Sequence, residues 1–368
     1  MKILHLVPSL KKGGAERMAL SIASGLQDEG HEVKLVCLHD VNEYRFLSKS
    51  LDCIVVKTNV QLSFMRSNRV DVSELQYVID TFQPDVIHSH LFESEINLAF
   101  CNIPLTCKRI IHFHDNMIQM KKFSINTLFK KSKTANFYER RLVLKKLPTN
   151  ATMIGISKDS MSFIMKNIPR YYNKKLVLNA IDIKRFSPGV KQKNKAELVT
   201  IGSLVSKKGH DLAVQTIFEL KKRGVEVHLT IIGDGPLRKE LKSLIDHLAL
   251  NDMISLKGLV DYPEVYLQNA SIYIHTASYE PFGLVLVEAM ACGLPVVCTD
   301  GKGNRDLIKE GRNGYMVWER NAELLADKIQ YLLEDNILLS RMANDAHVYA
   351  QQFNMNNYIQ KLLSIYSE

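Results

Sequence analysis

Short runs of Val, Ile and Leu recur along the chain and alternate with longer amphipathic segments. Runs of this length suit parallel strands that are buried on both faces. The amphipathic segments 15–30 and 211–224 each end at a glycine, which is typical of a helix C-terminus. The alternation predicts an α/β protein. The expected strands are residues 2–8, 31–38, 52–57, 85–90, 109–114, 152–157, 175–181, 197–205, 227–235, 253–258, 272–278, 295–300 and 314–318.

The strands form two consecutive sets, and 368 residues are enough for two domains. Residues 181–197 contain Pro, Gly and Lys and little that would be buried, so we expect the domain junction there. We predict two Rossmann-like, doubly wound domains over 1–185 and 186–349, with a C-terminal helix at about 350–368 packing back on the first. Two such domains facing a central cleft would bind ligands at the carboxyl ends of their strands.

Composition and cysteine usage narrow the class of protein. The 46% apolar content excludes a disordered chain, and apolar stretches end well before the 18 residues that a membrane span needs. The N-terminus has neither the apolar length nor the cleavage site of a secretory signal. The six cysteines form no CxxC pair and no zinc-spaced cluster. We therefore expect reduced thiols in a cytoplasmic protein.

Positive charge is concentrated in one region. Residues 121–175 hold 14 basic and two acidic residues, a net +12, so the rest of the chain carries −3 of the total +9. Aromatic and aliphatic residues interleave with these lysines, which fits a helix lying on an anionic membrane surface. An ordinary solvated helical face is the alternative. The expected membrane contacts are Lys130, Lys131, Lys145 and Lys146.

The segment from Glu280 to Val297, EPFGLVLVEAMACGLPVV, predicts a helix from about 281 to 292, with Pro281 as its first residue and Glu280 at its cap. Glu280 and Glu288 would lie roughly 12 Å apart along its axis. The two catalytic carboxyl groups of a glycosidase lie about 5 Å apart in retaining enzymes and about 6.5–9.5 Å apart in inverting enzymes. The spacing instead suits two carboxylates that hold hydroxyls at opposite ends of one elongated ligand. A Glu288 with a purely structural hydrogen bond is the alternative.

Other segments predict contacts with anions. The free N–H groups of Phe282, Gly283 and Leu284 at the helix start suit oxygen ligands. Gly13 and Gly14 follow the first strand, where glycines allow a phosphate or sugar to approach the backbone. Lys208 follows a later strand and is placed to neutralise a diphosphate, although the adjacent Lys207 offers the same charge. The sequence IIGDGPLR lacks the third glycine of a dinucleotide-binding fingerprint.

Two pairs of histidines end neighbouring predicted strands: His88 with His90, and His112 with His114. Side chains two residues apart share one face of a strand. A metal site is conceivable, but no HExxH pattern is present, and we predict none. A histidine at the carboxyl end of a strand is better suited to donate a hydrogen bond to a substrate.

Taken in order, these motifs resemble those of the family 4 retaining glycosyltransferases, which have the GT-B fold. The resemblance covers nearly the whole chain, and the Glu280/Glu288 element is its most specific part. The motifs are KKGGAER, PDVIHSHL, HFHDN, GISK, LNAIDIKRFSP, GSLVSKKGHD, IIGDGPLR, SLKGLV, EPFGLVLVEAMACGLPVV and GNRDLIKEGRNGYMV.

The resemblance implies a role for each matching residue. Glu280 and the amides of residues 282–284 would hold the donor sugar, and Glu288 the ribose. Lys208 would bind the diphosphate, and His114 would lie near the reacting sugar. The remaining donor contacts implied are Gly13 and Gly14 in a loop over the donor, the backbone near Lys257 and Gly258 at the base, and Ser203. Many family members have Arg where this chain has Ser203, so the chain departs from the family pattern at one phosphate contact.

The resemblance further implies a hexosyltransferase-type enzyme without cofactor or metal that transfers sugar with retention. Its donor would be a UDP- or GDP-sugar. Its acceptor would be a lipid-linked saccharide of a surface polysaccharide, such as capsule, O-antigen or exopolysaccharide, at the inner face of the cytoplasmic membrane. A GT-B sugar-nucleotide epimerase is one alternative. A basic nucleic-acid-binding protein is another, but the charge lies away from the nucleotide motifs, so we expect no nucleic-acid partner.

Overall fold

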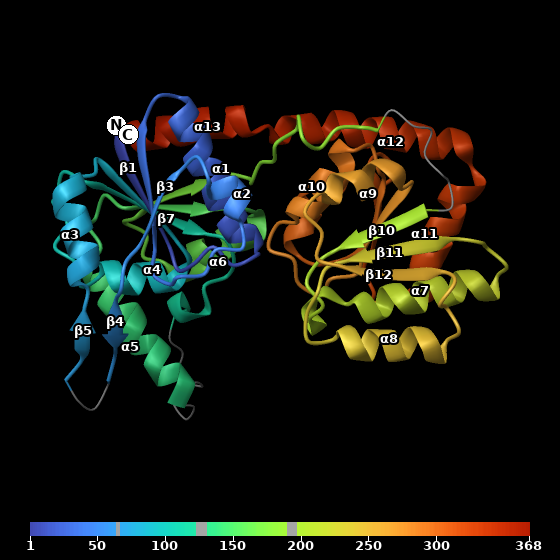
Figure 1. Cartoon of the computed structure of the whole chain (residues 1–368), viewed down its shortest axis with the longest axis horizontal. Coiled ribbons are helices and arrows are strands. Elements are labelled where there is room, and N and C mark those ends of the chain that lie inside the picture. Colours follow the sequence, from blue (N-terminus) through green and yellow to red (C-terminus); the bar gives the residue numbers. More distant parts are fainter. Residues whose placement is uncertain (64–66, 123–130, 190–196) are drawn as a thin grey trace. The chain divides into compact units, whose positions relative to one another are not determined.

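The computed structural model describes residues 1–63, 67–122, 131–189 and 197–368. It divides the chain into two compact units (Figure 1). Unit 1 contains Met1–Asn179 together with Met355–Glu368, and unit 2 contains Ala180–Asn354. The last helix of the chain therefore belongs to the first unit.

Unit 1 is built on a parallel sheet, with seven strands among the described residues. In sheet order they are β3 (Asp52–Val55), β2 (Glu32–Cys37), β1 (Lys2–Val7), β6 (Val86–His90), β7 (Lys108–Phe113), β8 (Thr152–Gly155) and β9 (Asn173–Leu176). The order runs outward from β1 on one side and from β6 on the other, which is the doubly wound arrangement. The switch point, where ligands bind in such sheets, therefore lies between β1 and β6.

Helices connect the strands of this sheet. They are α1 (Gly14–Asp28), α2 (Arg45–Ser48), α3 (Ser73–Phe82), α4 (Leu91–Leu98), η1 (Ile118–Met120), α5 (Lys131–Lys146) and α6 (Lys158–Asn167). The C-terminal helix α13 (Met355–Ser367) packs on α1, where the side chain of Ile359 lies against Gly25. An antiparallel hairpin of β4 (Asn59–Gln61) and β5 (Arg69–Asp71) was not predicted, because its strands are short and mostly exposed.

Unit 2 repeats the plan, with a parallel sheet of six strands in the described part of the chain. In sheet order they are β12 (Ile254–Gly258), β11 (His228–Ile232), β10 (Glu197–Ile201), β13 (Ile272–His275), β14 (Val296–Thr299) and β15 (Gly314–Val317). The switch point of this sheet lies between β10 and β13. The connecting helices are η3 (Ser206–Lys208), α7 (His210–Lys222), α8 (Arg238–His247), α9 (Pro263–Asn269), α10 (Leu284–Ala291), η4 (Gly303–Asp306), α11 (Ala322–Glu334), α12 (Asn336–Ala350) and η5 (Gln351–Phe353).

The predicted α/β class and the two Rossmann-like domains are confirmed. Every predicted strand is present. The apolar runs supply the buried side chains of the central strands; β1, for example, is buried at every position after Lys2. The edge strands β3, β9 and β12 are only partly buried. The seventh strand lies earlier than expected, at Asn173–Leu176 instead of 175–181.

The helix predicted over 281–292 is wrong at its N-terminus. Helix α10 begins at Leu284, and its cap is Gly283 instead of Glu280. Gly283 has φ = 102°, a left-handed conformation that interrupts the helix and that glycine adopts easily. Pro281 therefore lies in the preceding loop. Glu280 is held there as an extended residue that bridges to Lys302.

Candidate functional site

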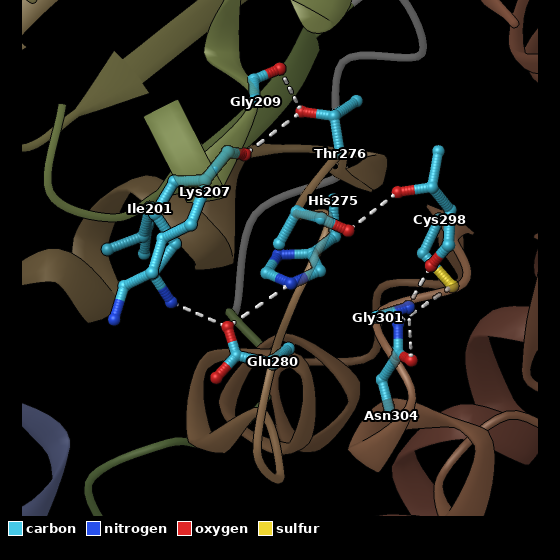
Figure 2. A network of polar contacts seen from close by, with 12 residues as sticks. Ile201, Lys207, Gly209, His275, Thr276, Glu280, Cys298, Gly301 and Asn304 are labelled. Atoms are coloured by element: carbon cyan, nitrogen blue, oxygen red, sulfur yellow. Dashed lines mark hydrogen bonds and ion pairs between the residues drawn. The ribbon is translucent and has the colours of Figure 1, made fainter. Parts of the chain in front are cut away.

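In unit 2, the loops that follow β10 and β13 meet at the switch point of the sheet. The loop after β10 carries Lys207, Lys208 and Gly209. The amide of Ser278 donates to the carbonyl of Lys207 (2.9 Å), and the hydroxyl of Thr276 donates to the carbonyl of Gly209 (2.7 Å, Figure 2). A side chain at Gly209 would place its Cβ 2.2 Å from the Thr276 carbonyl oxygen, so only glycine permits this approach.

This contact between loops brings Lys208 to Glu280. The ammonium of Lys208 donates to the Glu280 carboxylate at 2.6 Å. The Nε2 atom of His275 lies 3.3 Å from the same oxygen of Glu280, and Figure 2 shows these two side chains facing each other. The Glu280 side chain is 10% exposed and that of Lys208 is 19% exposed. The ion pair is therefore largely shielded from solvent, and each side chain keeps a small exposed fraction.

The charge of Glu280 is stabilised by its partner. Burial would raise the pKa of Glu280, but the ammonium of Lys208 and the contact with His275 outweigh burial and lower this pKa to about 2. Burial lowers the pKa of His275, so its imidazole is neutral at pH 7 and Lys208 supplies the positive charge. Glu280 is therefore a carboxylate, which accepts hydrogen bonds from hydroxyl groups.

A second loop fixes the backbone of Glu280. The Glu280 amide donates to the carbonyl of Gly301 (2.8 Å), and the Gly303 amide donates to the carbonyl of Glu280 (3.0 Å). Asn304 is fully buried and holds this loop closed: its Oδ1 accepts from the amide of Gly301, and its Nδ2 donates to the carbonyl of Thr299 (Figure 2). A Cβ at Gly303 would lie 2.0 Å from the carbonyl oxygen of Pro281.

A short loop, residues 281–283, joins Glu280 to the start of α10. In the described part of the chain, the amides of Phe282, Gly283 and Leu284 donate to no other group of the protein. The Phe282 side chain is buried and packs edge-on against Phe353, which anchors this turn in the core. The three amides and the helix dipole make a site for anionic or hydroxyl oxygens beside Glu280.

Glu288 is buried within α10, with 1% of its surface exposed. Burial, and then the charges of both Glu280 and Glu288, raise the pKa of Tyr273 on β13. Both carboxylates therefore lie within electrostatic reach of one ring at the switch point. The sequence spacing of Glu280 and Glu288 excludes a pair of glycosidase carboxylates. The contact of Glu288 with a ribose stays a prediction.

The loops after β11 and β12 complete this edge of unit 2. The amide of Gly233 donates to the carbonyl of Gly258 (2.8 Å), which places Gly258 beside the loop that follows β11. A Cβ at Gly233 would lie 2.0 Å from the Gly202 carbonyl oxygen. The glycines of IIGDGPLR thus have a structural role, because they allow the loops after β10 and β11 to pack together. Ser203 is exposed on the loop after β10.

In unit 1, the glycine pair lies at the start of α1. Gly13 is the N-cap and Gly14 is the first helical residue. The Tyr44 hydroxyl clamps this turn, because it accepts from the Gly13 amide (3.1 Å) and donates to the Gly13 carbonyl (2.9 Å). His114 follows the last residue of β7. Among the predicted catalytic and donor-binding residues, the structure thus places Gly13, Gly14 and His114 on unit 1 and the others on unit 2.

The four predicted histidines form a larger cluster that includes His5 and Tyr366. The strand register sets His5 beside His88 and His90 beside His112, so the side chains share one face of the sheet. They form two hydrogen-bonded lines. One joins His5, His90 and His114, with nitrogen–nitrogen distances of 2.9 and 2.8 Å. The other joins Tyr366, His88 and His112, at 2.6 and 3.1 Å.

Two groups of three in this cluster, His5/His88/His90 and His90/His112/His114, bring possible metal-ligand atoms within 4.8 Å of one another. The ring geometry does not favour coordination. The rings of His112 and His114 are stacked 4.1 Å apart at an interplanar angle of 18°, so their in-plane lone pairs run side by side and do not converge. Both nitrogens of His90 already take part in hydrogen bonds to other histidines.

Several residues of the site were not predicted from the sequence. His275 lies inside the predicted strand 272–278, and only the observed strand β13 ends at this residue. Thr276, Gly303 and Asn304 act by holding loops that are distant in sequence, and no local pattern marks them.

The predicted membrane contacts lie on and before α5. Lys130 lies outside the described residues, and the side chain of Lys131 is not described. Lys145 and Lys146 are exposed near the C-terminus of α5, while Val143 and Leu147 are buried in the core of unit 1. None of the helices in the described ranges combines the length and the apolarity that a bilayer span requires.

The chain matches two families of known proteins. Residues 12–173 match the family described as Glycosyltransferase Family 4, and residues 182–348 match the family described as Glycosyl transferases group 1. Only residues 1–11, 174–181 and 349–368 lie outside the two matches.

Individual relatives agree with these matches. The chain is 25% identical over 364 residues to N-acetylgalactosamine-N,N'-diacetylbacillosaminyl-diphospho-undecaprenol 4-alpha-N-acetylgalactosaminyltransferase from Campylobacter jejuni, covering 96% of this chain and 95% of that enzyme. It is 29% identical over 171 residues to alpha-D-kanosaminyltransferase from Streptomyces kanamyceticus, covering 46% of this chain and 44% of that enzyme. The match thus spans less than half the length of the second relative.

The fold is similar to that of HepE from Anabaena, solved in complex with UDP and glucose. The TM-score is 0.81 at 21% identity, and the match covers 100% of both chains. Because the two halves match in order and the whole fold is shared, the chain belongs to the family 4 glycosyltransferases and has a fold of the GT-B type.

Proposed function

We propose that this protein is a retaining, metal-independent glycosyltransferase that moves a sugar from a UDP- or GDP-sugar to a hydroxyl of a lipid-linked saccharide in surface-polysaccharide synthesis. The observation that carries the proposal is the contact between Lys208 and Glu280 at the switch point of unit 2. At this point a cation that can bind a diphosphate lies beside a carboxylate that can accept hydrogen bonds from sugar hydroxyls. A sugar nucleotide needs both contacts, because its sugar is bonded directly to its diphosphate.

In this proposal, unit 2 binds the donor. The carboxylate of Glu280 accepts hydrogen bonds from sugar hydroxyls, and the amides of residues 282–284 donate to the sugar or to the phosphate beside it. Lys208 neutralises the diphosphate as a point charge. Gly258 lies beside the base, and Glu288 holds the ribose. HepE contains UDP and glucose, and TarM from S. aureus contains UDP, which supports a nucleotide-sugar donor here.

The proposed reaction breaks the bond between the anomeric carbon and the diphosphate oxygen. A new bond forms from that carbon to the acceptor oxygen on the same face, and the acceptor proton passes to the leaving phosphate. Negative charge grows on the departing diphosphate in the transition state. Lys208 and the amides before α10 stabilise that charge without a metal.

The acceptor assignment rests on two observations. The full-length relative from Campylobacter is named for transfer to a diphospho-undecaprenol-linked saccharide. In addition, the region 121–175 carries a net charge of +12, and Lys145 and Lys146 are exposed within it. A cationic surface near anionic lipid would keep the enzyme close to a lipid-linked acceptor. We propose that the protein acts at the inner face of the cytoplasmic membrane.

Nucleotide binding tests the proposal directly. A ligand that binds only the folded state raises the unfolding temperature by mass action. We expect UDP or GDP, and the matching sugar nucleotide, to raise it, and we expect Lys208→Ala to reduce this response. Lys207→Ala removes a neighbouring exposed charge and should leave the response intact. No response to any nucleoside diphosphate would contradict the assignment.

A further inference from the structure

The end of α6 in unit 1 presents two large apolar side chains to solvent. Met165, in the last turn of α6, is 61% exposed, and Tyr171, in the turn that leads to β9, is 62% exposed. Single exposed apolar side chains are common on proteins and need no explanation. The charges around these two make them a candidate for a binding surface.

Basic residues surround the two apolar side chains. The segments 121–122 and 165–174 contain no acidic residue and five basic ones, which are Lys121, Lys122, Lys166, Arg170 and Lys174. Burial, and then the positive charge of Arg170, lower the pKa of Lys174. The cations therefore repel one another, and an anionic partner would relieve that repulsion.

Hydrogen bonds join these segments into one surface. Asn167, the last residue of α6, accepts from the amide of Lys122 through Oδ1 (2.8 Å), and its carbonyl accepts from Arg140 of α5 (2.7 Å). Burial lowers the pKa of Arg140 and the phenol of Tyr171 raises it, so Tyr171 lies near the same arginine. We call this the α6-end surface, and it consists of Lys121, Lys122, Met165, Lys166, Arg170, Tyr171 and Lys174.

The α6-end surface is continuous with the end of α5. The ring of Tyr171 lies 4.5 Å from that of the buried Tyr172, whose hydroxyl donates to the carbonyl of Leu144 (3.0 Å). The exposed Lys145 and Lys146 follow that carbonyl directly. These two predicted membrane contacts therefore lie next to the α6-end surface, and both belong to unit 1.

We propose that the α6-end surface docks unit 1 on an anionic lipid bilayer, with the side chains of Met165 and Tyr171 inserted among the lipid headgroups. Cations around an apolar centre are the composition of surfaces that lie in the membrane interface, where tyrosine is also enriched. The lysines and Arg170 bind lipid phosphates. The inference deepens the proposed function by naming the side chains that insert, and it rests on that function for the presence of a lipid-linked acceptor.

A tryptophan reporter tests the insertion directly. Trp318 is the single tryptophan of the chain, so a Trp318→Phe background has none. In that background, Met165→Trp places the fluorophore on the α6-end surface. Ile337→Trp is the control: Ile337 is 83% exposed on α12 of unit 2 and follows two acidic residues, Glu334 and Asp335, in the sequence.

The fluorescence is measured with vesicles of phosphatidylglycerol and phosphatidylcholine. We expect these vesicles to shift the emission of Met165→Trp to shorter wavelength, and lipids with brominated acyl chains to quench it. Ile337→Trp should show neither effect. Binding of the Met165→Trp variant to the vesicles without a shift or quenching would overturn the proposed insertion and leave a contact by charge alone.

Substitution of the apolar pair tests how much it contributes to binding. Met165→Ser/Tyr171→Ser should weaken vesicle binding by about tenfold or more, because less apolar surface leaves water. Tyr331→Ser/Ile337→Ser removes two side chains from unit 2 that are 53% and 83% exposed, and it should leave binding unchanged. Equal losses in the two variants would overturn the proposal.

Salt separates the apolar contribution from the electrostatic one. Interactions of exposed charges are screened over about 3 Å at 1 M salt. Lys166→Gln/Arg170→Gln should therefore weaken vesicle binding at low salt and have little effect at high salt. The loss in Met165→Ser/Tyr171→Ser should persist at high salt. A loss in that variant that disappears at high salt would contradict insertion.

Controls separate this inference from the proposed function. Cooperative thermal unfolding shows which variants are folded, and the tryptophan reporter decides the question if Met165→Ser/Tyr171→Ser is not. A wild-type protein that is stabilised by UDP or GDP but does not bind anionic vesicles would overturn the docking surface alone. Vesicle binding without any nucleotide response would contradict the proposed function and leave the surface standing. A fluorescence response of Met165→Trp to single-stranded DNA and not to vesicles would overturn the lipid assignment.

Discussion

The ammonium of Lys208 lies 2.6 Å from the carboxylate of Glu280, although 72 residues separate the two in the chain. The pair exists because β10 and β13 are neighbours in the sheet and the loops that follow them meet at its carboxyl edge. At this switch point the chain winds outward in both directions, which leaves room for a ligand between the loops.

The stability of this ion pair can be measured. Lys208→Ala leaves the Glu280 carboxylate buried without its cation, and we expect the free energy of unfolding to fall by about 2–3 kcal/mol, below the range for fully buried pairs because Lys208 is partly exposed. Adding Glu280→Gln removes the unpaired charge, so the double variant should be more stable than Lys208→Ala alone. Chemical denaturation of the wild-type protein, the two single variants and the double variant measures the coupling free energy between the two side chains. Strictly additive effects would show that the two side chains do not interact.

Sugar transfer should depend on the same lysine. Loss of Lys208 removes a charge that stabilises the departing diphosphate, and we expect Lys208→Ala to lower turnover by about 10²–10³-fold. Lys207→Ala serves as the control, because its side chain is exposed and only its carbonyl holds the loop. Turnover of both variants is compared with the sugar nucleotide that stabilises the wild-type protein. An equal loss of turnover in the two variants would contradict a specific role of Lys208 in stabilising the departing diphosphate.

The loop that holds Glu280 is equally sensitive. In Gly303→Ala the new Cβ would lie 2.0 Å from the Pro281 carbonyl oxygen, so the backbone at residues 280–281 must move. A displacement of about 1 Å at a substrate contact reduces the rate by about 10²-fold. Gly311→Ala is the control: Gly311 has φ = 73° but no atom within 4 Å of its Cβ position. We expect that control to lose about 1–2 kcal/mol of stability and to keep its activity.

Stability should fall in mild acid because of the histidine cluster. Burial lowers the pKa of all five histidines, to about 3 for His5 and His114. Between pH 6.5 and those lowered values, the unfolded chain binds more protons than the folded chain, so stability is lost as the pH falls below 6.5. Each histidine that stays neutral contributes about 1.4 kcal/mol per pH unit.

Urea unfolding at pH 7.5, 6.5 and 5.5 measures this dependence. His5→Asn removes one titrating group from the cluster and should reduce the slope below pH 6.5. His247→Asn removes an exposed histidine of α8 and should not reduce it. A stability that does not change between pH 7.5 and 5.5 would mean that the cluster accepts protons without unfolding.

Membrane contact is tested with vesicles. Lys145→Gln/Lys146→Gln removes two exposed charges of the basic region, and binding to anionic vesicles should weaken by about 1 kcal/mol for each lysine at low salt. Lys239→Gln/Lys242→Gln removes the same charge from exposed positions of α8 and should have no effect. Sedimentation with anionic and with zwitterionic vesicles provides the comparison. Similar losses in both variants would indicate an effect of net charge only.

Local sequence patterns were sufficient for the strands of the two parallel sheets. Buried strands of a doubly wound sheet need uninterrupted apolar residues, and each such run in the sequence became a strand. The start of α10 could not be placed in the same way. Pro281 is a favourable first helical residue, but the contacts of Glu280 with Gly301 and Gly303 hold this segment extended, and the left-handed Gly283 begins the helix instead. Those contacts join residues that are about 20 positions apart.

The functional residues also divide into those that the sequence identified and those that only the structure revealed. By itself, the sequence determined the two-domain α/β class, the candidates Lys208, Glu280 and His114, and the position of the histidine pairs on one face, because these follow from periodicity, from strand ends and from ordered motifs. Only the tertiary structure decided that Lys208, and not Lys207, reaches Glu280, and that His275 joins them. It alone extended the histidine pairs to His5 and Tyr366. The physical reason is that strand order and register, which no local pattern encodes, decide which side chains meet across a sheet.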